Sequence, residues 1–322
     1  MLVGRKSKIE EITKEMILLQ VLLLIVGFAM LVKGADWFVE GTAGIARKMG
    51  IPQLVVGLTI VAMGTSAPEA AVSITAALKG NAGITIGNIV GSNILNILII
   101  LGLTALIRAC TIQKSTLLIE IPFMILVTVV LLFMGKTGGV VTRFEGIILW
   151  VLFIAYLSYL FVLAKKGEKD EEAEERPVWK LLFFAVLGGA LVVWGSDVTV
   201  DSATKIAEAA GLSQRFIGLT IVAFGTSLPE LVTSLMAAKK GNSDIAIGNI
   251  VGSNIFNILF VVGTSACIIP ILFEANFIID TLVAIFTAVL LWVAVAKTRK
   301  LTYSWGIVML ITYAIYFVYL IS

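Results

Sequence analysis

The chain has 322 residues, of which 59% are hydrophobic and only 14% are charged, and its mean hydropathy is +1.04. A water-soluble domain of this length could not carry so many apolar side chains on its surface, so the composition places the chain in a lipid bilayer. The net charge of +3 is distributed over short loops and histidine is absent, which argues against nucleic-acid binding and against a histidine-based metal site.

Apolar stretches of about 20 residues, the length that crosses a bilayer as a helix, recur along the whole sequence. Their lengths and breakers predict an all-α integral membrane protein with ten transmembrane helices. In chain order, these helices are expected at residues 17–35, 40–79, 83–108, 115–134 and 143–164, then at 180–200, 201–240, 244–269, 276–297 and 302–321.

Ten charged residues lie between the fifth and sixth predicted helices and mark a solvated linker. The chain then divides into residues 1–164, the linker 165–178, and residues 179–322. Basic residues in the short loops favour an N-terminus outside and a cytoplasmic linker, in a multi-pass protein of the plasma membrane. The mixed-charge residues before the first apolar run argue against a cleaved signal peptide.

Two segments of the first half recur in the second half at a constant spacing. Residues 57–69 read GLTIVAMGTSAPE and residues 218–230 read GLTIVAFGTSLPE, so eleven of thirteen positions are identical at a displacement of 230 − 69 = 161. Residues 86–98 read IGNIVGSNILNIL, and twelve of these thirteen recur at 247–259, again displaced by 161. Because each half holds five helices, the second half enters the membrane from the opposite side, which predicts inverted repeats.

The first motif interrupts an apolar helix with proline. A proline lacks the backbone N–H and clashes with the carbonyl four residues earlier, so the helix breaks and frees backbone carbonyls. A glutamate follows each proline, in the first turn of a new half-helix. Two mid-membrane carboxylates with free carbonyls are the ligands that calcium prefers, whereas a simple proline kink is the plainer alternative. The residues are Gly64, Pro68 and Glu69, and Gly225, Pro229 and Glu230.

The second motif places polar side chains four residues apart on an apolar helix, at Asn88, Ser92 and Asn96 and again at Asn249, Ser253 and Asn257. Such a stripe must point toward protein or water, and its neutral oxygens suit sodium. The same segments carry glycines four residues apart, which let another backbone approach closely. Hydrogen bonding between helices is the alternative reading of this stripe.

Other polar residues are given structural interpretations. Acidic residues at Asp36, Asp197, Glu120, Glu145 and Asp280 are expected near helix ends, where water solvates them, with Asp36 and Asp197 as helix caps. The two cysteines, Cys110 and Cys267, lie far apart and are expected to be packing residues.

On these two motifs, the chain resembles the sodium/calcium exchangers of the calcium/cation antiporter superfamily, whose alpha repeats contain both. The resemblance covers both halves and implies ten helices, inverted repeats and four central ion sites. Potassium-dependent members carry an aspartate at the position of Asn257. Proton/calcium relatives usually carry a glutamate at the positions of Gly91 and Gly252. These departures argue against potassium co-transport and against their proton route.

The resemblance also implies ligands. Calcium would be bound by the carboxylates of Glu69 and Glu230 and by main-chain oxygens of Thr65 and Thr226. One sodium site would use Glu69, Ser92, Ser227 and the carbonyl of Ala223, and its mate would use Glu230, Ser253, Ser66 and the carbonyl of Ala62. Asn96 and Asn257 would flank the central position.

We therefore expect a secondary active antiporter that exchanges sodium for calcium by alternating access, with the first and sixth helices sliding across a rigid core. A proton/calcium antiporter and a calcium channel are the alternatives, and an enzyme is the weakest reading. The expected partners are the bilayer and the two transported ions, without a cofactor, and the expected state is a monomer.

Overall fold

The structure, a computed structural model, describes residues 2–80, 83–165, 176–210 and 223–321. Within these ranges the chain is helical except for two short antiparallel strand pairs. The first-half elements, in which η denotes a π-helix, are α1 (Leu2–Met49), α2 (Gln53–Val56), η1 (Gly57–Val61), α3 (Ala62–Thr65), α4 (Ala67–Leu78), α5 (Gly83–Leu95), η2 (Asn96–Leu101), α6 (Gly102–Ile107), β1 (Cys110–Thr111), η3 (Thr116–Glu120), α7 (Ile121–Gly138), β2 (Val140–Val141) and α8 (Arg143–Lys165).

The described elements of the second half follow a similar order. They are α9 (Val178–Ala209), α11 (Ala223–Gly225), α12 (Leu228–Lys239), α13 (Ser243–Phe256), η5 (Asn257–Val262), α14 (Gly263–Ile268), β3 (Ile271–Leu272), α15 (Ala275–Ala296), β4 (Lys300–Leu301) and α16 (Tyr303–Ile321). Among them, α15 is not preceded by a counterpart of η3. Residues 211–222, which fall inside the predicted helix 201–240, and most of the predicted linker lie outside the described residues.

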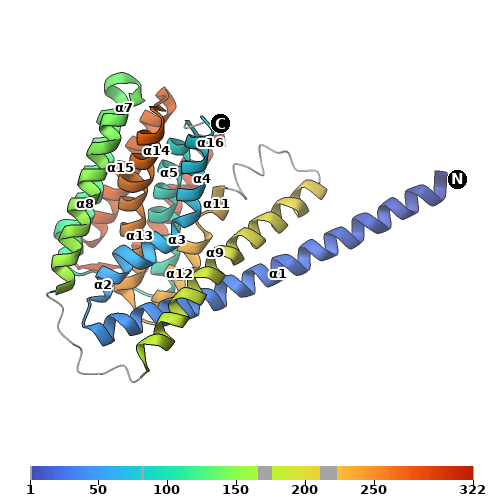
Figure 1. Ribbon diagram of the computed structural model, residues 1–322, viewed down its shortest axis with the longest axis horizontal. Coiled ribbons are helices and arrows are strands. Elements are labelled where there is room, and N and C mark those ends of the chain that lie inside the picture. The colour runs from blue at the N-terminus through green and yellow to red at the C-terminus, as the bar shows by residue number, and fades with distance from the viewer. Residues whose placement is uncertain (1, 81–82, 166–175, 211–222, 322) are drawn as a thin grey trace.

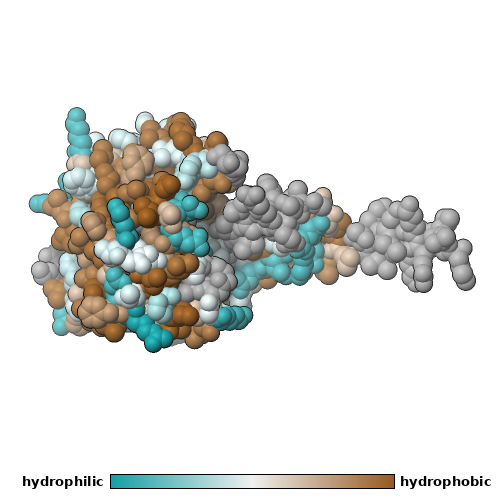
Figure 2. Space-filling view, turned by 90° about the horizontal axis from the view of Figure 1, so that it is seen from above, coloured by the Kyte–Doolittle hydropathy of each residue, from teal (hydrophilic) through white to brown (hydrophobic). Residues whose placement is uncertain are grey.

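The described residues contain eight helices that are long and apolar enough to cross a membrane. A ninth span is formed by Gln53–Thr65 and Ala67–Leu78, which meet at a bend of 51°. Large apolar side chains such as Phe144, Trp179 and Ile315 are exposed on the surface, and apolar residues cover much of the bundle in Figure 2. Lipid solvates such a surface and water does not, so the protein is a multi-pass membrane protein.

Helices α1 and α9 are longer than predicted, and they lie side by side and extend beyond the bundle (Figure 1). The expected ends of the first helix at residue 35 and of the sixth at residue 200 were wrong, because both helices run on without a break. Glycines allow the two backbones to touch. A Cβ atom on Gly34 would lie 2.9 Å from the carbonyl oxygen of Gly188, and one on Gly195 would lie 2.9 Å from that of Gly27.

The expected helix-capping roles of Asp36 and Asp197 were also wrong, because both residues lie in helix interiors. Asp36 is accommodated there by ion pairs with Lys33 and Lys240. Glu120 is fully buried rather than solvated, and one of its carboxylate oxygens accepts a hydrogen bond from Tyr159. A buried carboxyl group needs such a partner, which the sequence pattern did not reveal.

Two acidic residues do lie near helix ends. Glu145 is in the first turn of α8, where its Oε2 accepts a hydrogen bond of 2.7 Å from the backbone N–H of Thr142. Asp280 lies one turn into α15 and its Oδ1 accepts a hydrogen bond of 2.9 Å from the Tyr316 hydroxyl.

The centre of the bundle is α13, in which every residue from Ile245 to Phe256 is buried. Its glycines make this possible: a Cβ atom on Gly252 would lie 2.7 Å from the carbonyl oxygen of Leu58, so η1 packs directly on the α13 backbone. The close backbone approach predicted from the glycine spacing is therefore confirmed for the second half.

The two halves interlock through their outer elements. Helix α16 packs on α6, α14 packs on α8, and α15 packs on α7. Strand β1 pairs with β4, with Cys110 opposite Leu301, and β2 pairs with β3, with Val141 opposite Ile271. Each half therefore completes the other, and polar side chains of α4, α5, α12 and α13 are brought together in the interior.

Candidate functional site

Two broken helices supply the acidic side chains of the candidate site. Helix α3 ends at Thr65 and α4 begins at Ala67, with Pro68 and Glu69 in its first turn. Helix α11 ends at Gly225 and α12 begins at Leu228, with Pro229 and Glu230 in its first turn. In the structure, a helix ends just before each proline and a new helix begins at the residue preceding it. Proline fits at the start of a half-helix because it removes only an N–H that would have no intrahelical partner.

The two glutamates contact serines of the opposite half. Ser66 Oγ donates a hydrogen bond of 2.7 Å to Glu230 Oε1, and Ser227 Oγ donates one of 3.2 Å to Glu69 Oε1. Both glutamates are buried, with 1% of Glu69 and 0% of Glu230 exposed. The second oxygen of each carboxyl group, Oε2, has no hydrogen-bond partner among the described residues. A buried carboxylate in this state needs a counter-ion or a proton.

Ser66, the hydrogen-bond partner of Glu230, lies near further oxygen atoms. The Ser253 hydroxyl donates a hydrogen bond of 3.4 Å to the carbonyl oxygen of Ala62, and Ser66, which bonds Glu230, lies one helical turn after Ala62. The four residues expected at one sodium site, Ala62, Ser66, Glu230 and Ser253, are thus brought together from the two halves.

The set expected at the other sodium site is connected differently. Ser227 contacts Glu69, but the Ser92 hydroxyl donates to the carbonyl oxygen of Ile89 at 3.2 Å. Ala223 is the first residue of α11, directly after residues that the structure does not describe.

Four asparagines join the two halves at the centre of the bundle. The Nδ2 atoms of Asn93 and Asn254 donate to each other's backbone carbonyl oxygens at 3.2 and 3.1 Å. Asn96 Nδ2 donates to Asn254 Oδ1 at 3.0 Å, and Asn257 Nδ2 donates to Asn93 Oδ1 at 3.1 Å and to Ser92 Oγ at 3.4 Å. The carboxamide oxygens of Asn96 and Asn257 have no partner among the described residues, so they remain available as ligands.

Sequence reasoning did not include Asn93 and Asn254 in the site. The polar stripe was defined by spacings of four, and these residues lie one position off it. Their spacing of three to Asn96 and Asn257, which also places residues on one helix face, was the signal that could have identified them.

A second layer of hydrogen bonds holds the glutamate-bearing helices. Asn88 Nδ2 donates to Ser73 Oγ, and Asn249 Nδ2 donates to Ser234 Oγ, both at 2.9 Å. Ser73 and Ser234 each lie one turn after a glutamate. These pairs fix α4 against α5 and α12 against α13, so part of the polar stripe serves as interhelical hydrogen bonding, as the alternative interpretation predicted.

The two threonines next to the breaks are not equivalent in their contacts. Thr65 is buried and its hydroxyl donates to Asn249 Oδ1 at 3.0 Å. Thr226 is half-buried, and its hydroxyl has no partner among the described residues. Thr226 and Gly225 instead line a cavity of 710 Å³ between α4 and α9. The other lining residues are Ala67, Pro68, Ala71, Val72, Val193, Ser196, Asp197, Val200, Asp201 and Thr204.

The corresponding place in the other half is filled. There, α1 packs on α12, and Leu31, Ala35 and Leu228 are buried together with Val232 packed against them. In the described part of the chain, residues 161 positions apart therefore line a cavity in one half and are packed together in the other.

The chemistry of the site is that of oxygen ligands. No group of three histidine, cysteine, aspartate or glutamate side chains is found within the part of the chain that the structure describes. Any ion at Glu69 and Glu230 must complete its coordination with hydroxyl, carboxamide and carbonyl oxygens, which suit hard cations such as calcium and sodium.

The family model described as sodium/calcium exchanger protein matches residues 19–162 and 180–322. The chain is 41% identical to the putative antiporter CaxA of Alkalimonas amylolytica over 80% of this chain and 83% of that protein. It is also 32% identical to the sodium/calcium exchanger MaX1 of Methanosarcina acetivorans over 95% and 99% of the two chains.

A solved structure is equally similar. The sodium-calcium exchanger NCX_Mj, soaked with zero Na⁺ and Ca²⁺, superposes with a TM-score of 0.84 at 34% identity, covering 94% of this chain and 99% of the other. The residues that the family model matches include both motifs and both glutamates. The chain therefore belongs to the sodium/calcium exchanger protein family.

Proposed function

We propose that the protein exchanges sodium for calcium across a membrane, and that the two ions compete for Glu69 and Glu230. Membership of an exchanger family supports cation antiport involving calcium. The observation that carries the finer proposal is the pair of crossed hydrogen bonds, Ser66 to Glu230 and Ser227 to Glu69, which buries one carboxylate from each half in a shared polar interior. The ions are the transported substrates of this site.

In this proposal, Glu69 and Glu230 bind calcium together with main-chain oxygens of Thr65 and Thr226. One sodium ion binds Glu230, Ser66, Ser253 and the carbonyl of Ala62, and another binds Glu69, Ser92, Ser227 and the carbonyl of Ala223. Asn96 and Asn257, whose carboxamide oxygens lack partners, flank the central position. Because the ions share both carboxylates, a full complement of one excludes the other, and this competition couples their movements.

We further propose that the chain forms ten helices in two inverted repeats, residues 1–164 and 179–322, joined by a cytoplasmic linker. The exchange of partners between the halves, as in the pairing of β1 with β4 and of β2 with β3, supports this arrangement. With the N-terminus outside, the α4–α9 cavity opens away from the cytoplasm. Helices α1 and α9, joined by their glycine contacts, then slide over the remaining helices to open the other side. The protein acts as a monomer in the plasma membrane.

The test is calcium-45 uptake into sodium-loaded proteoliposomes that contain the full chain. Glu69→Gln and Glu230→Gln each remove one negative charge from the site while keeping its shape, and both are expected to reduce sodium-dependent uptake to that of protein-free liposomes. Glu145→Gln is the matched control, because this half-buried glutamate lies in the first turn of α8 and bonds Thr142 rather than a residue of the site, and it should transport normally. Near-normal exchange by either site variant would refute the assignment.

The same vesicles separate the alternatives. Uptake that follows an imposed pH gradient at constant sodium would indicate a proton/calcium antiporter. Uptake that persists without any cation on the opposite side would indicate a channel. Dependence on internal sodium at constant pH is the result expected here.

A further inference from the structure

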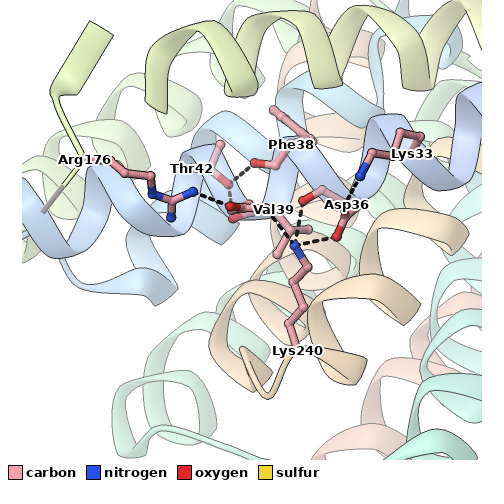
Figure 3. Close-up of polar contacts among 8 residues, drawn as sticks. Lys33, Asp36, Phe38, Val39, Thr42, Arg176 and Lys240 are labelled. Atoms are coloured by element: carbon pink, nitrogen blue, oxygen red, sulfur yellow. Dashed lines mark hydrogen bonds and ion pairs between the residues drawn. The ribbon is translucent and has the colours of Figure 1, made fainter. Parts of the chain in front are cut away.

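A cluster of charged residues ties α1 to the end of α12, on the side where the linker meets α9 (Figure 3). Lys240 caps the C-terminus of α12, and its Nζ lies 2.6 Å from Asp36 Oδ1, 2.8 Å from the Asp36 carbonyl oxygen and 3.4 Å from Glu40 Oε2. Arg176 pairs with Glu40 and Lys33 pairs with Asp36. The ammonium group of Lys240 therefore has an acceptor on α1 for each of its three N–H donors.

The same three charges recur 161 residues away: 240 − 79 = 161 for Lys79, 197 − 36 = 161 for Asp197, and 201 − 40 = 161 for Asp201. Lys79 caps the C-terminus of α4 as Lys240 caps α12. In the described part of the chain, however, Lys79 forms no ion pair with either aspartate, and Asp201 pairs with Lys205 of its own helix at 2.6 Å.

The separated charges belong to the open side of the molecule. Asp197 and Asp201 line the 710 Å³ cavity between α4 and α9. Their counterparts Asp36 and Glu40 lie on α1, which is packed on α12. The exposed fractions agree with this: the side chain of Asp201 is 67% exposed, compared with 35% for Glu40.

We propose that these residues form two alternative ion-pair latches. Lys240 with Asp36 and Glu40 holds the linker side closed, and Lys79 with Asp197 and Asp201 holds the opposite side closed when the cavity collapses. This inference rests on the alternating access proposed above and adds to it the groups that stabilise each end state.

Only one latch can be closed at a time, because α1 and α9 move together. Their backbones touch at Gly34 with Gly188 and at Gly27 with Gly195, so a shift that brings α9 onto α4 draws α1 away from α12. Each latch is partly exposed, so it contributes modestly to the equilibrium and can be broken in every transport cycle.

The experiment measures access to the two sides by thiol labelling of the full chain in lipid nanodiscs, in a buffer free of sodium and calcium. Both native cysteines are replaced by alanine, and one reporter cysteine is introduced as Ala71→Cys in the cavity or as Val232→Cys at the equivalent packed position. A positively charged methanethiosulfonate reagent is the probe. Without further change, the reporter at position 71 should react quickly and the reporter at 232 slowly.

Lys240→Gln should raise the labelling rate at position 232 by about fivefold, the effect expected of a partly exposed ion-pair network, and should lower the rate at 71. Lys79→Gln should lower the rate at 232. Lys239→Gln is the matched control, since this neighbouring lysine forms no ion pair within the described ranges, and it should leave both rates unchanged. Asp36→Asn combined with Glu40→Gln should reproduce the effect of Lys240→Gln, and this variant decides the question if Lys240→Gln fails to fold.

The proposal is overturned if Lys240→Gln and the Asp36/Glu40 double variant both leave the labelling rate at position 232 within about twofold of the rate without these changes. A latch with an effect of about fivefold must shift the populations of the two states by more than that. The proposal is also overturned if the rates at 71 and 232 rise together, because that result indicates local loosening. Labelling requires no transport, so the latches can fail while sodium-driven calcium uptake by the same protein stays intact. Normal uptake by Glu69→Gln would instead refute the exchange site and leave the labelling result standing.

Discussion

Replacement of Asn254 by alanine tests whether the central asparagines hold the two halves together. Asn254→Ala removes the hydrogen bond from its Nδ2 to the Asn93 carbonyl oxygen and the one that its Oδ1 accepts from Asn96 Nδ2. The Asn96 amide is then left buried with one donor group unsatisfied, since Asn96 is only 1% exposed.

The expected loss follows from these contacts. A hydrogen bond between membrane helices contributes on average about 0.6 kcal/mol, and a buried donor left without an acceptor costs about 1–3 kcal/mol. Two lost bonds and one unsatisfied donor therefore predict that the free energy of unfolding falls by about 2–4 kcal/mol. Asn254→Ala combined with Asn96→Ala should lose less than the sum of the two single changes, by about 1 kcal/mol, because the second change removes the unsatisfied amide.

The assay is reversible unfolding by dodecyl sulfate in mixed micelles, followed by the fluorescence of the six tryptophans. Asn242→Ala is the control, because this asparagine precedes the same helix, α13, and its side chain does not cap it. Its effect should remain below about 0.5 kcal/mol. An Asn254→Ala protein as stable as this control, or strictly additive losses for Asn254 and Asn96, would refute the reasoning.

Two further predictions concern residues outside the site. Gly34→Leu should abolish the yield of monodisperse protein in size-exclusion chromatography, because the new Cβ would lie 2.8 Å from the Cβ of Leu191. Gly138→Leu, at a position with no atom within 4 Å of a Cβ, should leave the yield unchanged, and equal yields of the two variants would contradict the close α1–α9 contact. Tyr159→Phe should lower the free energy of unfolding by about 1–3 kcal/mol, because it removes the hydrogen-bond donor to buried Glu120. Glu120→Gln should keep calcium uptake within about twofold of the unsubstituted protein, and loss of uptake would instead give this carboxyl group a role in transport.

Much of the architecture could be predicted from the sequence because its signals are local or repetitive. Apolar length identified the membrane helices, since about 20 residues are needed to cross a bilayer. The prolines at 68 and 229 located the helix breaks, because the steric effect of proline acts within one turn. The constant displacement of 161 residues showed which positions are equivalent, Lys79 and Lys240 among them.

Other features depend on contacts between distant parts of the chain. Gly34 and Asp36 resemble the end of a helix, yet α1 continues because α9 packs on its glycines and Lys240 forms an ion pair with Asp36. Buried Glu120 resembles a residue near a helix end until Tyr159 is placed beside it.

The asymmetry between the two halves was likewise decided only by the tertiary structure. Nearly identical motifs encode both sides of the site, but α1 packs on α12 while α4 and α9 enclose a cavity. Sequence alone determined that this membrane protein has two equivalent sets of polar and acidic residues. Which set is covered and which is open depends on how the α1–α9 pair is positioned against the other helices, and near-identical local sequences cannot specify that choice.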